Sequence, residues 1–239
     1  MNKFINTGEK MGYIYETHMH SSEVSGCAIK TAAEQVRIFK QKGYTGVIFT
    51  DHFTNGYTNC PRHISWKEKM LFTISGYLNA KREGDKCGLD VFFGWEYTIR
   101  GSDFLTYGLD LDFLLSNPDI DYLSIDKYSK LVRDNGGFIA QAHPYKDDYY
   151  VEHKFPVDHK YLDAVEVFNP SVSDIVNEKA WYFAEKYDLP MLAGTDSHGR
   201  AGKLFSGIEL DTKAESIYDI IDDIKNCKVK MILPEWFTI

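Results

Sequence analysis

The chain has 239 residues, a length that fits one large domain, and 44% of them are hydrophobic, which is ample for a core. Its formal net charge is −8, from 27 basic and 35 acidic residues, and no basic stripe marks a surface for polymeric nucleic acid. No run is apolar enough for a transmembrane helix, and residues 1–6 lack the apolar stretch of a signal peptide. We therefore expect a cytoplasmic protein with one domain over residues 1–239 and no membrane or nucleic-acid partner.

Strand-like and helix-like segments alternate along the chain. Runs rich in β-branched, aromatic and small apolar residues predict seven strands, at residues 12–15 (running on into 16–20), 45–50, 89–95, 104–108, 138–142, 162–168 and 189–195. Amphipathic or capped stretches predict helices at residues 31–42, 66–82, 126 to the glycines at 136–137, 174–187 and 215–226.

This alternation predicts parallel strands with helical crossovers. The expected fold is therefore α/β, a distorted (β/α)7 TIM-like barrel, and an open doubly wound sheet is the alternative. The distortion is expected because the connection between the third and fourth strands is too short for a helix. No Gly-x-Gly-x-x-Gly motif follows a predicted strand, so a dinucleotide site has no support.

His18 and His20 form the first candidate metal site. Alternate residues of a strand share a face, so the two imidazoles point the same way, with Cα atoms roughly 7 Å apart. Two neutral imidazoles directed at one point can grip a transition metal. The pair alone is equally consistent with hydrogen-bonded core residues. Other candidate ligands in the chain are needed to favour a metal site.

Further candidates stand at the carboxyl ends of the predicted strands. Together with the first pair, the set is His18, His20, His52, Glu96, His143, Asp196 and His198. In a parallel barrel these ends share one rim, which is where the active sites of such barrels lie. Imidazole with carboxylate suits zinc, manganese or iron better than calcium or magnesium. The set therefore predicts a transition-metal centre at this rim.

Five motifs together resemble the PHP (polymerase and histidinol phosphatase) family, over about residues 12–206. They are His18-Met19-His20-Ser21, Thr50-Asp51-His52, Glu96, Ala142-His143-Pro144 and Gly194-Thr195-Asp196-Ser197-His198. The resemblance implies a distorted (β/α)7 barrel carrying two or three divalent transition-metal ions (Zn, Mn or Fe). It also implies an allotment of ligands: His18, His20, Glu96 and Asp196 to one ion, His52 and His143 to a second, and His198 with a bridging Glu96 to a third.

The chain departs from the family pattern at two positions. The family often has Asp or His six or seven residues after the second histidine, where this chain has Gly26 and Cys27, and either Cys27 or Glu23 could replace that ligand. A further histidine is common shortly after the glutamate, and here the nearest candidate is Asp103.

The activity implied by the resemblance is metal-dependent hydrolysis of small phosphomonoesters, such as histidinol phosphate, sugar phosphates or nucleotides. A metal-bridging hydroxide would be the nucleophile. The catalytic residues would then be His18, His20, Glu96, Asp196 and His198. The planar guanidinium of Arg200 or Arg62 could grip the substrate phosphate. The alternatives are a nuclease or phosphodiesterase, a phosphotyrosine-protein phosphatase, and a metal-binding regulatory module without turnover.

Four polar residues near the predicted rim have open roles. Glu16 could orient a ligand histidine or be a lumen charge satisfied elsewhere. Asp51 points away from His52 and is expected to cap the following segment. Glu166 and Asn169, at the end of the sixth strand, could line the site or be structural.

Overall fold

The computed structural model describes residues 12–149, 151–152, 154–200 and 205–239. These residues form the strands β1 (Tyr13–Met19), β2 (Gly46–Phe49), β3 (Asp90–Ile99), β4 (Ser102–Tyr107), β5 (Phe138–Gln141), β6 (Ala164–Phe168), β7 (Met191–Ala193), β8 (Gly207–Leu210) and β9 (Lys230–Ile232). The helices are α1 (Ala32–Gln41), α2 (Trp66–Thr73), α3 (Ser75–Cys87), α4 (Leu111–Ser116), α5 (Ile125–Asp134), α6 (Asp174–Tyr187) and α7 (Ile217–Lys225), with 3₁₀ turns η1 (Ile120–Tyr122) and η2 (His159–Tyr161).

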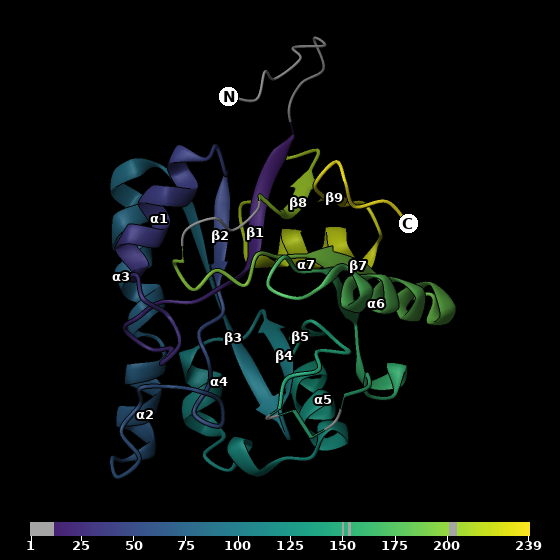
Figure 1. Cartoon of the computed structure of the whole chain (residues 1–239). Helices are drawn as coiled ribbons and strands as arrows, with labels where there is room; N and C mark the ends of the chain where they lie inside the picture. The colour runs from purple at the N-terminus through teal and green to yellow at the C-terminus, as the bar shows by residue number, and fades with distance from the viewer. Residues whose placement is uncertain (1–11, 150, 153, 201–204) are drawn as a thin grey trace.

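The strands make one mixed sheet in the order β7-β6-β5-β4-β3-β2-β1-β8-β9. An isolated parallel bridge between Met19 and Ser197 joins the end of β1 to the segment after β7. The sheet is therefore barrel-like and nearly closed, and α1–α3 lie on one side of it while α6 lies on the other (Figure 1). An α/β fold is confirmed. The described residues contain nine strands rather than the seven expected, because the short β8 pairs antiparallel with β1 and β9 pairs antiparallel with β8.

The fourth strand runs against its neighbours. A two-residue loop, Arg100 and Gly101, connects β3 to β4, with φ values of 51° and 81°. Positive φ at both central residues is typical of the tight hairpin turn that matches the twist of antiparallel strands. β4 consequently pairs antiparallel with both β3 and β5. The expectation of parallel strands throughout is wrong here, and the reversal places the beginning of β4 at the rim where β3 and β5 end.

Most predicted helices occur, with one split and one addition. The predicted helix 66–82 is two helices that meet at Ile74, and α3 continues to Cys87. Gly76 in α3 lies so close to Asp51 that an added Cβ would stand 2.3 Å from its Oδ2. The split thus lets the backbone of α3 approach the segment after β2. The sequence interpretation did not include α4.

Helix α7 closes one end of the sheet interior. Ile220, Ile221 and Ile224 are buried against inward residues such as Tyr15, Leu105 and others from β5 and β8. Polar residues lie at the opposite end of the sheet interior. No helix in the described part of the chain is both long and apolar enough to cross a membrane.

Candidate metal centre

The structure brings together all eight predicted metal ligands. They come from β1 and its end (His18, His20), the end of β2 (His52), β3 (Glu96), the start of β4 (Asp103), the end of β5 (His143) and the segment after β7 (Asp196, His198). Six of these side chains are buried, and those of His52 and His198 are 13% and 17% exposed.

Ligand atoms from four residues enclose a space of metal size, with both oxygens of Glu96 taking part. His18 Nε2 and His20 Nε2 are 3.1 Å apart; His18 Nε2 lies 3.3 Å from Glu96 Oε1, His20 Nε2 lies 3.5 Å from Glu96 Oε2, and the two nitrogens lie 3.5 and 3.2 Å from Asp196 Oδ1. Ligands about 2.0–2.1 Å from a tetrahedral zinc ion are separated from one another by about 3.3–3.4 Å. The spacing of these donors therefore fits a single transition-metal ion.

Hydrogen bonds to the other ring nitrogens orient these histidines. His18 Nδ1 lies 3.0 Å from Glu166 Oε1, and His20 Nδ1 lies 3.0 Å from Ser25 Oγ. The Ser25 hydroxyl donates to Asp51 Oδ1, so its oxygen accepts from His20. Both histidines then carry the Nδ1 proton in their neutral form and direct the Nε2 lone pair to the ligand space, which is the usual arrangement of metal-bound histidine.

A second cluster consists of Glu96, Asp103 and His143. His143 Nε2 is 3.3 Å from Glu96 Oε1 and 3.9 Å from Asp103 Oδ2. Thr98 Oγ1 donates to Asp103 Oδ1 and fixes this carboxylate. Asp103 reaches the cluster because β4 is antiparallel, so the candidate named from sequence occupies a ligand position by a topology that the sequence interpretation did not foresee.

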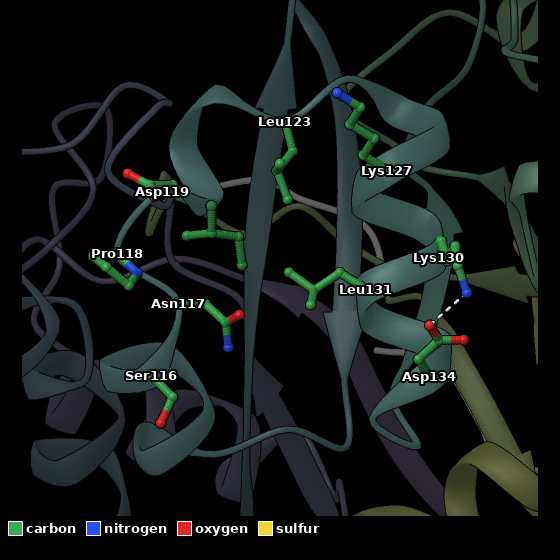
Figure 2. A pocket seen from close by; sticks show the side chains of 10 residues that line it. Ser116, Asn117, Pro118, Asp119, Leu123, Lys127, Lys130, Leu131 and Asp134 are labelled. Atoms are coloured by element: carbon green, nitrogen blue, oxygen red, sulfur yellow. Dashed lines mark hydrogen bonds and ion pairs between the residues drawn. The ribbon is translucent and has the colours of Figure 1, made fainter.

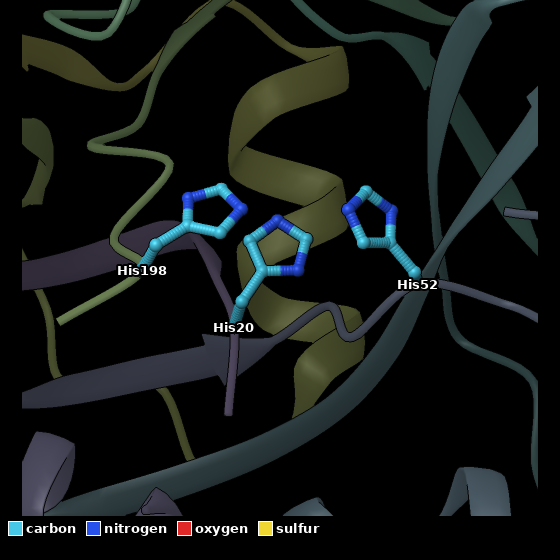
Figure 3. Close-up of side chains that lie close together, drawn as sticks. All are labelled: His20, His52 and His198. Atoms are coloured by element: carbon cyan, nitrogen blue, oxygen red, sulfur yellow. The ribbon is translucent and has the colours of Figure 1, made fainter. Parts of the chain in front are cut away.

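The third cluster consists of three imidazoles, those of His20, His52 and His198 (Figure 3). The ring centroids of His20 and His198 are 4.3 Å apart and those of His20 and His52 are 4.5 Å apart. His52 Nδ1 and Glu96 Oε2 lie 2.7 Å apart, yet neither of these buried atoms has a hydrogen-bond partner. Buried polar atoms in such a position fit ligands that face a shared cation.

The clusters differ from the allotment implied by the resemblance. Both schemes use the same residues, with Glu96 shared between ions. The structure, however, groups His52 with His198 and His143 with Asp103, and it also places His143 near His18 and Glu166.

Carboxylates and imidazoles set one another's charge in the metal-free centre. Burial alone would lower the pKa of His18, but Glu166, Asp196 and Glu96 raise it well above its ordinary value. Burial opposes the same effect at two other imidazoles, where Glu96 raises the pKa of His52 and Asp196 raises that of His198. A metal ion bound here would therefore have to displace protons that the carboxylates favour on His18 and His52.

We expect metal binding to release protons at neutral pH. The histidines with a raised pKa are protonated there, and each must lose a proton to bind a metal. Metal affinity should accordingly increase as the pH rises through neutrality. Calorimetric titration of the metal-free protein with Zn²⁺, in buffers of different protonation enthalpy, measures the number of protons released. Binding without proton release would contradict this charge arrangement.

The backbone is constrained at two ligands and at a nearby glycine. His143 and Asp196 have φ values of 27° and 48°, a region that non-glycine residues rarely adopt and that concentrates at functional sites. A Cβ on Gly194 would stand 2.7 Å from both Glu166 Oε1 and His18 Cβ. The absence of a side chain at Gly194 therefore allows Glu166 to reach His18.

The polar residues with open roles now have partners. Glu16 accepts hydrogen bonds from the backbone N–H groups of His18 and Thr195, so it supports the backbone rather than an imidazole. Glu166 binds the His18 ring, the His143 N–H and the side chain of Asn169. The expectation that Asp51 caps the following segment is wrong. Its carboxylate instead accepts hydrogen bonds from Ser21 and Ser25 in the segment after β1.

Glu23 and Cys27, the two candidates for the ligand that the family has six or seven residues after the second histidine, have different surroundings in the structure. Glu23 accepts from the Ala32 N–H and from Asn79, a structural role at the start of α1. The thiol of Cys27, in contrast, lies beside His52 and His198. Burial would raise the pKa of Cys27, but the two imidazoles lower it to about 7.

The two arginines predicted to bind substrate, Arg62 and Arg200, have exposed side chains, and their role stays a prediction. A pocket of about 440 Å³ lies elsewhere, between the end of α4, η1 and α5 (Figure 2). Its lining includes Lys127 and Lys130 but none of the predicted site residues. The predicted site residues therefore lie at the ends of the strands, away from this pocket.

Several solved structures have a fold similar to that of this chain. The structure resembles a two-domain protein from Bacteroides vulgatus that contains an inferred PHP-like metal-dependent phosphoesterase (TM-score 0.70, 14% identity, 94% of this chain and 69% of that chain). It also resembles an inferred metal-dependent phosphoesterase from Bifidobacterium adolescentis (TM-score 0.56, 14% identity, 90% and 97%). An amidohydrolase from Chromobacterium violaceum, with bound sulfate and no metal, is similar too (TM-score 0.57, 12% identity, 90% and 97%).

At the sequence level, residues 174–229 match the model of the PHP-associated family. No curated protein matches the chain. The family match and the shared fold support a protein of the PHP family, the family that the five motifs resemble.

Proposed function

We propose that the protein is a metal-dependent hydrolase of small phosphomonoesters. The observation that carries the proposal is a set of overlapping clusters of His, Asp and Glu, two of which share Glu96; within each cluster the ligand atoms lie within 4.8 Å of one another. Two or three divalent ions held there would bind phosphate oxygens, activate a water molecule and stabilise the leaving oxygen.

The residues of the chain prepare this chemistry in three ways. His18, His20, Glu96 and Asp196 would hold one ion, Glu96, Asp103 and His143 a second, and His52 and His198 a third. Glu166 and Ser25 orient His18 and His20 through their Nδ1 atoms. The exposed Arg200, two residues after His198, would contact the substrate phosphate. The strands and the segments directly after them would hold the metal-binding groups in place before a substrate binds, so little reorganisation would accompany the reaction.

A substrate panel tests the proposal. The protein loaded with Mn²⁺, Fe²⁺ or Zn²⁺ should hydrolyse p-nitrophenyl phosphate and at least one of histidinol phosphate, a sugar phosphate or a nucleotide. Release of terminal nucleotides from oligonucleotides would instead indicate a nuclease, and release of phosphate from phosphotyrosine peptides a protein phosphatase. Cleavage of amides without cleavage of phosphate esters would place the activity with the amidohydrolase neighbour. Stoichiometric metal without hydrolysis in any assay would favour a regulatory module.

A further inference from the structure

The buried carboxylate of Asp51 lies next to the metal centre but belongs to none of the clusters described above. It accepts hydrogen bonds from the Ser21 N–H at 2.6 Å, from Ser21 Oγ at 2.7 Å and from Ser25 Oγ at 2.7 Å. Both serines are fully buried. Gly76 in α3 covers this group so closely that an added Cβ would stand 2.3 Å from Asp51 Oδ2 and 2.4 Å from Ser21 Oγ. The carboxylate and its donors are therefore shielded from water.

The Ser25 hydroxyl links this carboxylate to two predicted metal ligands. Its oxygen lies 3.0 Å from His20 Nδ1 and accepts from the His52 N–H at 3.0 Å, while its hydrogen is donated to Asp51 Oδ1. A hydroxyl has one hydrogen to donate and two lone pairs that accept. The His52 N–H is always a donor and an ionised Asp51 is always an acceptor, so the remaining lone pair of Ser25 can only accept. His20 must therefore carry its proton on Nδ1.

The proton on Nδ1 leaves His20 with one ligand atom, Nε2. This nitrogen lies 3.1 Å from His18 Nε2 and 3.2 Å from Asp196 Oδ1, so it faces the ligand space that these residues enclose with Glu96. Without the Ser25 oxygen, the other tautomer would be favoured, because Asp196 could then accept from a proton on Nε2. That tautomer has no lone pair directed at the ligand space.

We propose that Asp51 is a positioning residue of the metal centre: by holding the Ser25 hydrogen, it fixes the His20 proton on Nδ1 and keeps Nε2 free for a metal ion. The same hydroxyl supports the backbone of His52, so one carboxylate serves ligands from β1 and from the segment after β2. A metal-bound histidine usually donates its second N–H directly to a carboxylate, a carbonyl or water, and here a serine is interposed. The proposal rests on the metal centre of the proposed function but not on its reaction.

NMR of the metal-free full-length protein, labelled with ¹⁵N-histidine, tests the proposal because two-bond ¹H–¹⁵N correlations distinguish the two neutral tautomers. The spectra are recorded at a pH where His20 is neutral, and its signals are those missing from His20→Gln. We expect the Nδ1–H form in the unaltered protein and the Nε2–H form in Ser25→Ala and Asp51→Leu. Asp51→Asn should keep the Nδ1–H form, because its amide oxygen can take the Oδ1 position while its NH₂ group donates to Ser21 Oγ.

Metal affinity gives a second measurement. Competition with a chelator should show that Ser25→Ala binds Zn²⁺ about 10–100-fold more weakly, the usual effect of losing a group that orients a metal ligand. The matched control is Ser129→Ala, which removes a buried hydroxyl that donates to Tyr161 O. It should change neither the His20 tautomer nor the affinity, and circular dichroism identifies the folded variants.

The outcomes separate the two proposals. An Nε2–H form of His20 in the unaltered protein, or an Nδ1–H form that persists in folded Ser25→Ala or Asp51→Leu, would overturn the role of Asp51 and leave the proposed function standing. An Nδ1–H form that depends on Ser25 and Asp51, in a protein that binds metal but hydrolyses no phosphate ester, would support this role and overturn the proposed function.

Discussion

Glu96→Gln is expected to remove most of the bound metal and to lower kcat/KM for a phosphomonoester by about 10³-fold. Glu96 is the residue shared between clusters, with Oε1 3.3 Å from both His18 Nε2 and His143 Nε2, and Oε2 2.7 Å from His52 Nδ1. The amide replaces one anionic oxygen by a donor that faces imidazole nitrogens. Loss of about 4 kcal/mol of the charge stabilisation that metals supply corresponds to the 10³-fold effect.

Metal content by mass spectrometry and kcat/KM should fall together in this variant. Glu209→Gln makes the same chemical change in β8, where Glu209 lies near Lys230 rather than in a cluster, and should leave both unchanged. Because Glu96 also balances buried imidazoles, circular dichroism must show that the variant is folded. Glu96→Asp keeps the charge and should retain part of the metal. Near-normal activity of folded Glu96→Gln would contradict a shared ligand.

Sequence reasoning found the ligands because the ends of strands converge whatever the details of the barrel. His18, His52, His143 and Asp196 each follow or end a strand whose apolar pattern is clear, so their meeting required only that the strands share a sheet. The hairpin at Arg100 and Gly101 was predictable in principle, since two apolar runs separated by two residues that include glycine indicate a tight turn.

Other parts of the site depend on contacts that no local pattern encodes. Cys27 and Glu23 are the two candidates for one ligand, and the fold of the segment after β1 distinguishes them. Glu23 accepts a hydrogen bond from the Ala32 N–H at the start of α1, whereas the imidazoles of His198 and His52 lower the pKa of Cys27. The role of Glu166 depends on the bridge between Met19 and Ser197, which brings the segment after β7 to the end of β1, and on Gly194 leaving space for the carboxylate. Glu166 and His18 are 148 positions apart in the sequence, and alternation of strands and helices alone does not reveal such a pairing.

Glu166→Gln is expected to weaken metal binding by about 10–100-fold, the usual cost of losing a residue that orients a metal ligand. Glu166 accepts from three donors: His18 Nδ1 at 3.0 Å, the His143 N–H at 2.9 Å and Asn169 Nδ2 at 2.9 Å. Glutamine offers one acceptor oxygen and one NH₂ group. Whichever way the amide is turned, its NH₂ group meets at least one donor, so either His18 or the backbone at His143 loses its support.

Metal titrations distinguish this positioning role from direct ligation. In Glu166→Gln the ligand nitrogens of His18 and His143 remain, so excess metal should restore kcat to near the unaltered value, with the defect confined to the metal dissociation constant. Glu96→Gln should not recover in this way, because it lacks the ligand itself. The control Glu178→Gln, on the exposed side of α6, should bind metal normally. Unchanged metal affinity in Glu166→Gln would mean that neighbouring contacts hold His18 in place without the carboxylate.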